Sequence, residues 1–371
     1  MAGSELGAVE HAGHSSEGRS RRTGAGRIGS PVDRSSHCIF KQFAKAMQVV
    51  AGKILVLGTG GTIAGTAGNA KDNIGYTAAQ LGIDQLLAAV PGLERAAGGA
   101  RLEAEQVAQI DSKDMDGAVW RVLALRCAEA LADPEMRALV VTHGTDTLEE
   151  TAWFLHRVLA GARDKPVVLV SAMRPATALA PDGPQNLLDA VSVAATPGAR
   201  GVVAVAAGEV HGAQRVQKVH PYRLNAFASG EAGPLGWMEE GRVRLAAGWP
   251  APDCSAEADA ALKALRSGAE WPRVEVVMSH AGATGRLVDL LVADGVHGLA
   301  VAATGNGTLH HHLQAALERA QAAGVAVRVA TRCSLGQLLP RPGDTLPVAQ
   351  GLSVVKTRVE LLLERLAQPQ A

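Results

Sequence analysis

Residues 53–66 read KILVLGTGGTIAGT, and residues 138–147 read ALVVTHGTDT. Each stretch begins as a run of apolar, largely β-branched residues, which is typical of a strand buried on both faces of a parallel sheet. Each then ends in glycines and threonines. Because ligands of parallel α/β sheets bind beyond the carboxyl ends of the strands, we expect both clusters to lie at one ligand-binding edge. They could form a phosphate cradle or two halves of a catalytic pocket.

The segments that follow alternate between strand and helix patterns. PVVLVSA (166–172) and GVVAVAA (201–207) predict two further buried strands. Between them and the second cluster lies TLEETAWFLHRVL (147–159), whose apolar residues recur at spacings of three and four. This pattern predicts an amphipathic helix with a buried stripe formed by Leu148, Ala152, Leu155 and Leu159.

Two further features complete the first part of the chain. Thr147 and Glu150 have the T-x-x-E spacing of a capping box, which predicts that the helix begins directly after GTD. A second helix is predicted over QNLLDAVSVAAT (185–196). Strands joined by helices in this way predict a doubly wound α/β domain, which we assign to residues 47–245.

The strand pattern lapses over 246–272, a stretch rich in Pro and Ala that we interpret as a linker, and then resumes. Strands are predicted at 274–280, 298–304 and 325–331, with helices near 284–294 and 308–323 and a closing helix in VKTRVELLLERLA. The sequence therefore predicts a second, smaller α/β domain over 273–371.

Residues 1–46 differ from the rest in being rich in Gly, Ser and Arg without any structural period, so we expect a disordered tail. Met47 directly precedes the ordered pattern. Our hypothesis is that translation begins there and that the tail is not native, although a tail that is made and does nothing explains the pattern equally well. The tail has no apolar segment typical of a secretory signal.

Composition narrows the classes of function and partner. The 371 residues carry 36 basic and 36 acidic side chains, and only 3% are aromatic. This balance argues against binding to nucleic acid or to an anionic membrane surface. The four cysteines are scattered without a C-x-x-C pair, which argues against common zinc and redox motifs. Together with the missing signal, they lead us to expect a cytoplasmic protein.

The glycine clusters fit a catalytic pocket better than a phosphate cradle. From Gly58 the sequence places Ile63 where a dinucleotide fingerprint needs its third glycine, and no G-K-[ST] follows. Glycines allow close backbone approach, and Thr62 would project a hydroxyl from such a turn. Because a threonine is a weak nucleophile until a neighbour accepts its proton, a base is required, and Lys218 and Tyr76 are both candidates.

At this point the residues resemble a known family. LGTGGTIAGT and VVTHGTDTLEETAWFL closely resemble the two signature segments of the bacterial-type L-asparaginases, and the resemblance continues through QIDSKDMD and SAMRPATALAPDGPQNL. It implies a larger α/β domain followed by a smaller one. It also implies a hydrolase that converts L-asparagine to L-aspartate and ammonia through a threonine ester, with some glutaminase activity and without a metal or cofactor. A homo-oligomer built as a dimer of dimers is implied as well.

The resemblance also implies roles for individual residues. Thr62 would attack the amide from a mobile loop that delivers Tyr76, whereas Thr145, Asp146 and Lys218 would form a second hydroxyl and base system. Which threonine attacks first stays open.

Substrate recognition is implied for a second set of residues. Ser112 would bind the substrate α-carboxylate and Asp146 the α-ammonium. Lys113 stands where the commonest family residue is Gln, so it would add a cation near the α-carboxylate. Gly282 replaces the Asn that many secreted members extend into a neighbouring subunit's site, and RCSLGQLLPRPGD has no counterpart of a loop Glu found in some members.

Two other hypotheses use the same pocket. A catalytically silent sensor of asparagine or aspartate would keep the pocket without turnover, but it would not need the nucleophile and base. The amidase subunit of a tRNA-dependent amidotransferase would carry a folded domain before the first cluster, and we expect the tail at 1–46 to be too short and too polar to form one.

Several polar groups outside this set have simpler explanations. Asp111, Asp114 and Asp116 are expected to cap and solvate the following helix, and His310–His312 to form a solvated helix start rather than a metal site. For His143, orienting the turn and serving as an ordinary buried histidine are equally good explanations.

Overall fold

The computed structural model describes residues 52–159, 164–251 and 256–368. The expected tail at 1–46 and Met47 lie outside these ranges. The larger part of the fold is built on one eight-stranded sheet with the order β10-β9-β6-β5-β4-β3-β1-β2. Five of its strands are parallel: β1 (Lys53–Gly60), β2 (Arg101–Ile110), β3 (Met136–Thr142), β4 (Pro166–Val170) and β5 (Gly201–Ala206).

An antiparallel extension completes this sheet. It consists of β6 (Glu209–Gly212), β9 (Gly236–Glu239) and β10 (Arg242–Leu245). The α/β class predicted from the sequence is confirmed, but this extension was not predicted. Its strands are only four residues long, and β10 is mostly exposed, so they lack the continuous apolar runs of the parallel strands.

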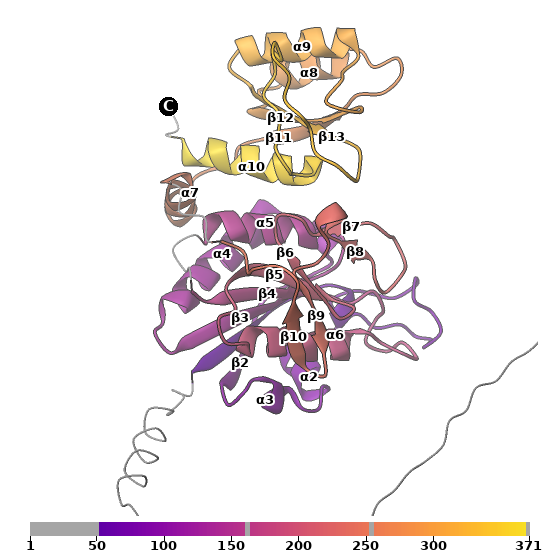
Figure 1. The fold of residues 1–371 in the computed structure, drawn as a ribbon, viewed down its shortest axis with the longest axis vertical. Coiled ribbons are helices and arrows are strands. Elements are labelled where there is room, and N and C mark those ends of the chain that lie inside the picture. Colours follow the sequence, from indigo (N-terminus) through magenta and orange to yellow (C-terminus); the bar gives the residue numbers. More distant parts are fainter. Residues whose placement is uncertain (1–51, 160–163, 252–255, 369–371) are drawn as a thin grey trace, which may run out of the picture. The chain divides into compact units, whose positions relative to one another are not determined.

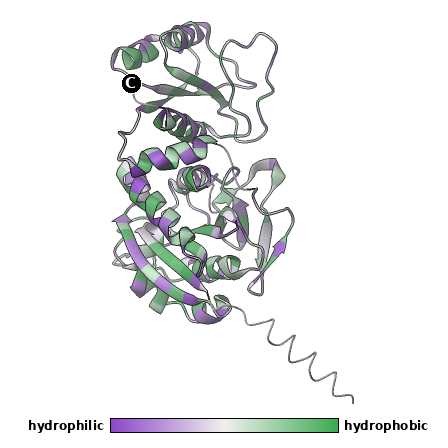
Figure 2. Ribbon diagram, turned by 90° about the vertical axis from the view of Figure 1, so that its left-hand side faces the viewer, coloured by the Kyte–Doolittle hydropathy of each residue, from purple (hydrophilic) through white to green (hydrophobic). Residues whose placement is uncertain are grey.

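Helices cover both faces of the sheet (Figure 1). On one face lie α4 (Gly117–Ala132) and α5 (Leu148–Val158), and on the other α2 (Ile83–Ala88), α3 (Leu93–Ala96) and α6 (Gly183–Ala195). Alternate residues of each strand enter the two resulting cores, as with Leu55 in one and Val56 in the other. Figure 2 shows a mixture of hydrophobic and hydrophilic residues along the helices.

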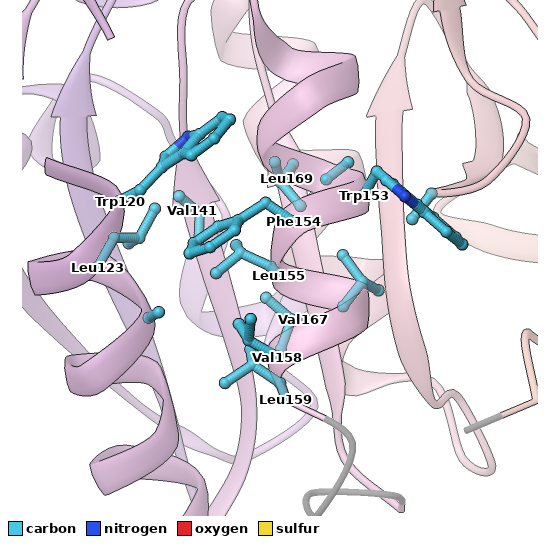
Figure 3. Close-up of a cluster of buried hydrophobic side chains, with 14 of the residues drawn as sticks. Trp120, Leu123, Val141, Trp153, Phe154, Leu155, Val158, Leu159, Val167 and Leu169 are labelled. Carbon is cyan, nitrogen blue, oxygen red and sulfur yellow. The ribbon is translucent and has the colours of Figure 1, made fainter. Parts of the chain in front are cut away.

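Helix α5 has the predicted buried stripe, and it is buried more widely than an amphipathic surface helix. Trp153 and Phe154 are buried in addition to the four predicted positions. The Phe154 ring stacks on Trp120 of α4 with centroids 4.7 Å apart (Figure 3). The Trp120 indole N–H donates to the Thr151 hydroxyl at 2.9 Å. The helix is therefore enclosed by neighbours on most of its circumference.

The predicted capping box of α5 is wrong. The helix begins at Leu148 directly after Thr147, as expected, but the Thr147 side chain makes no cap hydrogen bond. Its hydroxyl donates instead to the carbonyl oxygen of Ser112 at 2.8 Å. Thr147 therefore bonds to a residue distant in the sequence instead of capping its own helix, and it connects the loop before α5 to the loop that contains Ser112.

The smaller part has a three-stranded parallel sheet of β11 (Val274–Met278), β12 (Gly298–Ala303) and β13 (Ala326–Thr331). Helices α8 (Arg286–Ala293) and α9 (His311–Ala322) lie on one face and α10 (Val354–Ala367) on the other (Figure 1). All of these elements were predicted. Within the expected linker the structure adds α7 (Ala256–Arg266), an Ala-rich helix that packs against α10.

Across the described part of the chain, no helix is both long and apolar enough to cross a membrane.

Candidate active site

The two glycine and threonine clusters meet at one edge of the large sheet. Strands β1 and β3 are parallel neighbours, with Gly58 opposite Thr142, so both chains leave the sheet side by side. Gly60 and Gly61 have φ of 102° and 82°, and a Cβ on Gly61 would lie 2.4 Å from the backbone nitrogen of Gly144. The predicted juxtaposition of the clusters is therefore confirmed, and it requires glycine.

A hydroxyl pair forms the first half of the site. Thr62 opens the short 3-10 helix η1 (Thr62–Ala64) after this glycine turn, and its side chain is buried. Its Oγ1 lies 2.6 Å from the Tyr76 hydroxyl oxygen, in a loop held by an antiparallel bridge between Thr66 and Thr77. Burial raises the pKa of Tyr76 although the Thr62 hydrogen bond lowers it, and Asp111 and Asp146 raise it further. The phenol is therefore uncharged at neutral pH.

A hydroxyl, an ammonium and a carboxylate form the second half. Lys218 lies on β7 (Gln217–Lys218), which pairs with β8 (Phe227–Ala228). Its Nζ donates to Thr145 Oγ1 at 2.7 Å and to Asp146 Oδ1 at 2.6 Å. The structure therefore brings Thr145, Asp146 and Lys218 together, as predicted. Lys218 comes from β7, which lies outside the two glycine and threonine clusters.

Ser112 lies against the second half. It begins the 3-10 helix η2 (Ser112–Asp114), is buried, and its Oγ accepts a hydrogen bond from the Asp146 amide at 3.2 Å. A Cβ on Gly144 would lie 2.4 Å from the same Oγ. The Lys113 ammonium is exposed and forms an ion pair with Asp114. Its contact with a substrate stays a prediction.

The neighbouring acidic residues include two helix caps, as expected. The carboxylate of Asp111 accepts from the Lys113 amide at the start of η2. Asp116 accepts from the Val119 amide at 2.9 Å at the start of α4.

His143 is a buried, uncharged residue of the second cluster. Its Nδ1 lies 2.7 Å from the Gly144 carbonyl oxygen, and burial lowers its pKa to about 4. A neutral ring can donate this hydrogen bond from Nδ1, which fixes the tautomer of His143. The same bond holds the carbonyl group of Gly144, the residue that Gly61 approaches closely. The geometry is that of a residue that orients the turn.

Two charged residues beside the site were missed by the sequence analysis. Glu149 accepts a hydrogen bond from the Lys218 amide at 3.2 Å, and Lys356 of α10 is completely buried nearby. The sequence contains a signal for the second residue. Lys356 occupies the apolar stripe that continues through Val359, Leu363 and Leu366, where a lysine is out of place.

The histidine run at the start of α9 forms a helix terminus. His310 is the N-cap residue, and its ring accepts from the His312 amide at 3.3 Å. Within the described ranges, no group of three or more His, Cys, Asp or Glu side chains has an arrangement that could hold a metal ion.

Comparisons with known proteins cover most of the chain. The family models "Asparaginase, N-terminal" and "Glutaminase/Asparaginase C-terminal domain" match residues 53–250 and 273–362. The chain is 34% identical over 317 residues to a glutaminase-asparaginase of Pseudomonas fluorescens biotype A, covering 82% of this chain and 84% of that protein. It is 36% identical over 285 residues to L-asparaginase 2 of Escherichia coli K12, covering 76% and 78%.

A solved structure agrees with these matches. The crystal structure of a probable cytoplasmic L-asparaginase from Campylobacter jejuni has a TM-score of 0.75 and 34% identity to this chain, and the match covers 84% of this chain and 94% of that one.

Proposed function

The chain belongs to the asparaginase family, and from this premise we propose that it hydrolyses L-asparagine to L-aspartate and ammonia through a threonine ester. L-Glutamine is the proposed minor substrate, because one of the relatives is a glutaminase-asparaginase. The observation that carries the proposal is the pair of threonine hydroxyls at one sheet edge, each within 2.7 Å of a side chain able to exchange a proton.

In the proposed first step, Thr62 attacks the side-chain amide carbon. The Thr62 Oγ–C bond forms, the C–N bond breaks, and the hydroxyl proton ends on the departing nitrogen to give ammonia. Tyr76, at 2.6 Å from Thr62 Oγ1, is the nearest group that can accept this proton while releasing its own. Its raised pKa keeps it protonated before attack, so the transfer accompanies bond formation.

In the proposed second step, water attacks the threonine ester and the Thr62 proton is restored. The system of Thr145, Lys218 and Asp146 supplies fixed charge beside the reacting carbonyl, where preorganised donors stabilise a developing oxyanion. Lys218 also holds Thr145 in one orientation, and Thr145 can then orient the attacking water.

The α-carboxylate and α-ammonium of the substrate are assigned to Ser112 and Asp146. Ser112 Oγ accepts from the Asp146 amide, which leaves the Ser112 hydroxyl proton for an anion. Asp146 is half-exposed, and its carboxylate suits an ammonium group. Lys113 is proposed to turn from Asp114 toward the α-carboxylate when substrate binds.

We propose a cytoplasmic homo-oligomer. The probable cytoplasmic relative supports the location, whereas the H. influenzae relative is a probable periplasmic L-asparaginase. The proposed self-association surface is α8, on which Leu287 and Leu290 lie one turn apart and are exposed.

The test is ammonia release by the full chain offered L-asparagine and L-glutamine separately, beside Thr62→Ala and Thr145→Ala. We expect turnover of asparagine, slower turnover of glutamine, and loss of activity in both variants. Rapid acid quenching of the wild type with asparagine should trap a mass increase of an aspartyl group on Thr62. Aspartate binding without ammonia release from a folded protein would instead favour the sensor hypothesis.

A further inference from the structure

Lys356 presents a completely buried ammonium outside the site described above. It lies in the first turn of α10, and its Nζ donates to the carbonyl oxygens of Gln214, at 2.9 Å, and Val216. Burying an ammonium is costly unless hydrogen bonds and an opposite charge compensate. The two carbonyls supply the hydrogen bonds, so the ammonium binds this backbone segment directly.

The segment held by Lys356 leads into the strand that carries Lys218. Val216 is two residues before Lys218, and β7 begins at Gln217. Residues 213–215 form a turn just before β7, and Lys356 binds one carbonyl within this turn and one just after it. Two contacts on the backbone that leads into the strand limit how far it can shift, and the reach of the Lys218 side chain toward Thr145 depends on where that backbone lies.

Glu149 closes the same arrangement from α5. One carboxylate oxygen accepts from the Lys218 amide at 3.2 Å, and the other from the Ser353 hydroxyl at 3.4 Å, beside the first residue of α10. Burial lowers the pKa of Lys356 to about 7, and the Glu149 carboxylate opposes this. Burial raises the pKa of Glu149, and Lys356 in turn lowers it, so the two charges stabilise each other.

We propose that Lys356 is a positioning residue for the amidohydrolase reaction, holding residues 214–218 so that the Lys218 ammonium meets Thr145 and Asp146. The smaller domain thereby takes part in the reaction through α10, without contacting substrate. The inference rests on the proposed function, because it gives Lys218 its role.

The residues on the buried side of α10 indicate that Lys356 does more than fill space in the core. Its other buried stripe positions, Val359, Leu363 and Leu366, are apolar, and an apolar residue at 356 would bury comparable area without the cost of desolvating a charge. The Lys356 ammonium instead forms directional hydrogen bonds to the backbone just before Lys218. Such bonds fix where this backbone lies, which apolar packing alone cannot do.

The experiment compares the full-length wild type with Lys356→Met, with Lys356→Met/Glu149→Gln and with Leu366→Ala. The double variant removes the uncompensated carboxylate, and Leu366→Ala leaves a cavity at the other end of α10. Lys218→Met is measured in parallel. The kcat and KM for L-asparagine are determined at a temperature at which each variant is folded, and Tm is recorded by calorimetry.

We expect kcat of Lys356→Met to fall by about 10- to 100-fold, because a displacement of about 1 Å in a reacting group can cost that much. The change in KM should be smaller than that in kcat, since Ser112 is not displaced. The double variant should regain Tm but not kcat, whereas Leu366→Ala should lose Tm and keep kcat.

Three results would overturn the inference. Wild-type kcat in Lys356→Met would show that the anchor is not needed, and recovery of kcat together with Tm in the double variant would show that Lys356 serves stability alone. If Leu366→Ala lost as much kcat as Lys356→Met, any disturbance of α10 would lower kcat, and Lys356 would have no specific role. Absence of ammonia release by the wild type is a different result, which removes the proposed function and with it the reaction that Lys356 would serve.

Discussion

The contact between Gly61 and Gly144 brings the two threonine clusters together, and it tolerates no side chain. For Gly61→Ala we predict a loss of stability of roughly 3 kcal/mol or more, from the left-handed conformation and from the clash with Gly144. The rate of ammonia release should fall by more than the fraction of unfolded protein explains, because Thr62 directly follows Gly61. Urea unfolding and ammonia release measure the two effects. Gly248→Ala is the control, since its Cβ would meet open space, and equal behaviour of the two variants would contradict the argument.

The Tyr76 hydroxyl is the other residue-scale determinant of the site. Tyr76→Phe removes the partner of Thr62 while keeping the ring, so we predict a kcat roughly 10²- to 10⁴-fold lower, the usual contribution of general acid–base catalysis. Steady-state kinetics at pH 7 provide the measurement. Tyr222→Phe is the matched control because Tyr222 is the only other tyrosine and is mostly exposed. Retained kcat in Tyr76→Phe would show that Tyr76 does not accept the Thr62 proton.

The sequence predicted some residues of the site better than others, for a physical reason. Thr62 and Thr145 stand at the ends of apolar runs, so strand patterns alone place them at one sheet edge. Ser112 and the partnership of Lys218 with Thr145 depend on folding of distant segments, and only the family resemblance indicated them. Glu149 was missed because a glutamate in the first turn of a helix usually serves the helix dipole.

At the scale of elements, α5 and α10 bury ionisable groups between them, and Glu150 gives this a measurable consequence. Burial raises its pKa to about 7, Glu149 adds to the rise, and Arg358 at 4.0 Å opposes it. Because the folded-state pKa exceeds the ordinary value of 4.5, the folded protein holds this proton more tightly. The resulting stabilisation is present below pH 4.5 and is lost as pH rises through 7.

Glu150→Gln should therefore stabilise the protein at pH 8 and change little at pH 4.5. The expected gain is on the order of 3 kcal/mol, from about 1.4 kcal/mol for each pH unit of the shift. Urea unfolding at the two pH values measures it, with the exposed Glu129→Gln as control. A gain that is the same at both pH values would show that ionisation of Glu150 is not its cause.

Elements were predictable where burial left a continuous pattern. The strands β1, β3, β4 and β5 are buried on both faces, so their apolar runs are unbroken. Strand β2 at the sheet edge is only partly buried and mixes charged with apolar residues, so its pattern is weak. Helix α7 was missed since alanine-rich sequence between two domains resembles a linker, and its packing against α10 is a tertiary effect.

At the scale of the whole molecule, the two parts share one hydrophobic core. Leu155 and Val158 of α5 belong to the same cluster as Val359 and Leu362 of α10 and Leu265 of α7. Contacts of this kind couple the unfolding of both parts, so the sheet edge that carries the two threonine clusters and the smaller domain are expected to lose structure together. The same coupling allows α10 to influence residues 214–218.

Self-association is the last property that belongs to the whole molecule. Leu287 and Leu290 are 53% and 57% exposed on one side of α8, in a chain whose other α8 leucine, Leu291, is partly buried. If this surface joins subunits, Leu287→Lys/Leu290→Glu should lower the mass measured by light scattering to that of a smaller assembly without lowering helix content, because buried charges oppose association. Leu245→Lys, at the exposed strand β10, should leave the mass unchanged. A mass unaffected by the α8 substitutions would place the subunit interface on another surface.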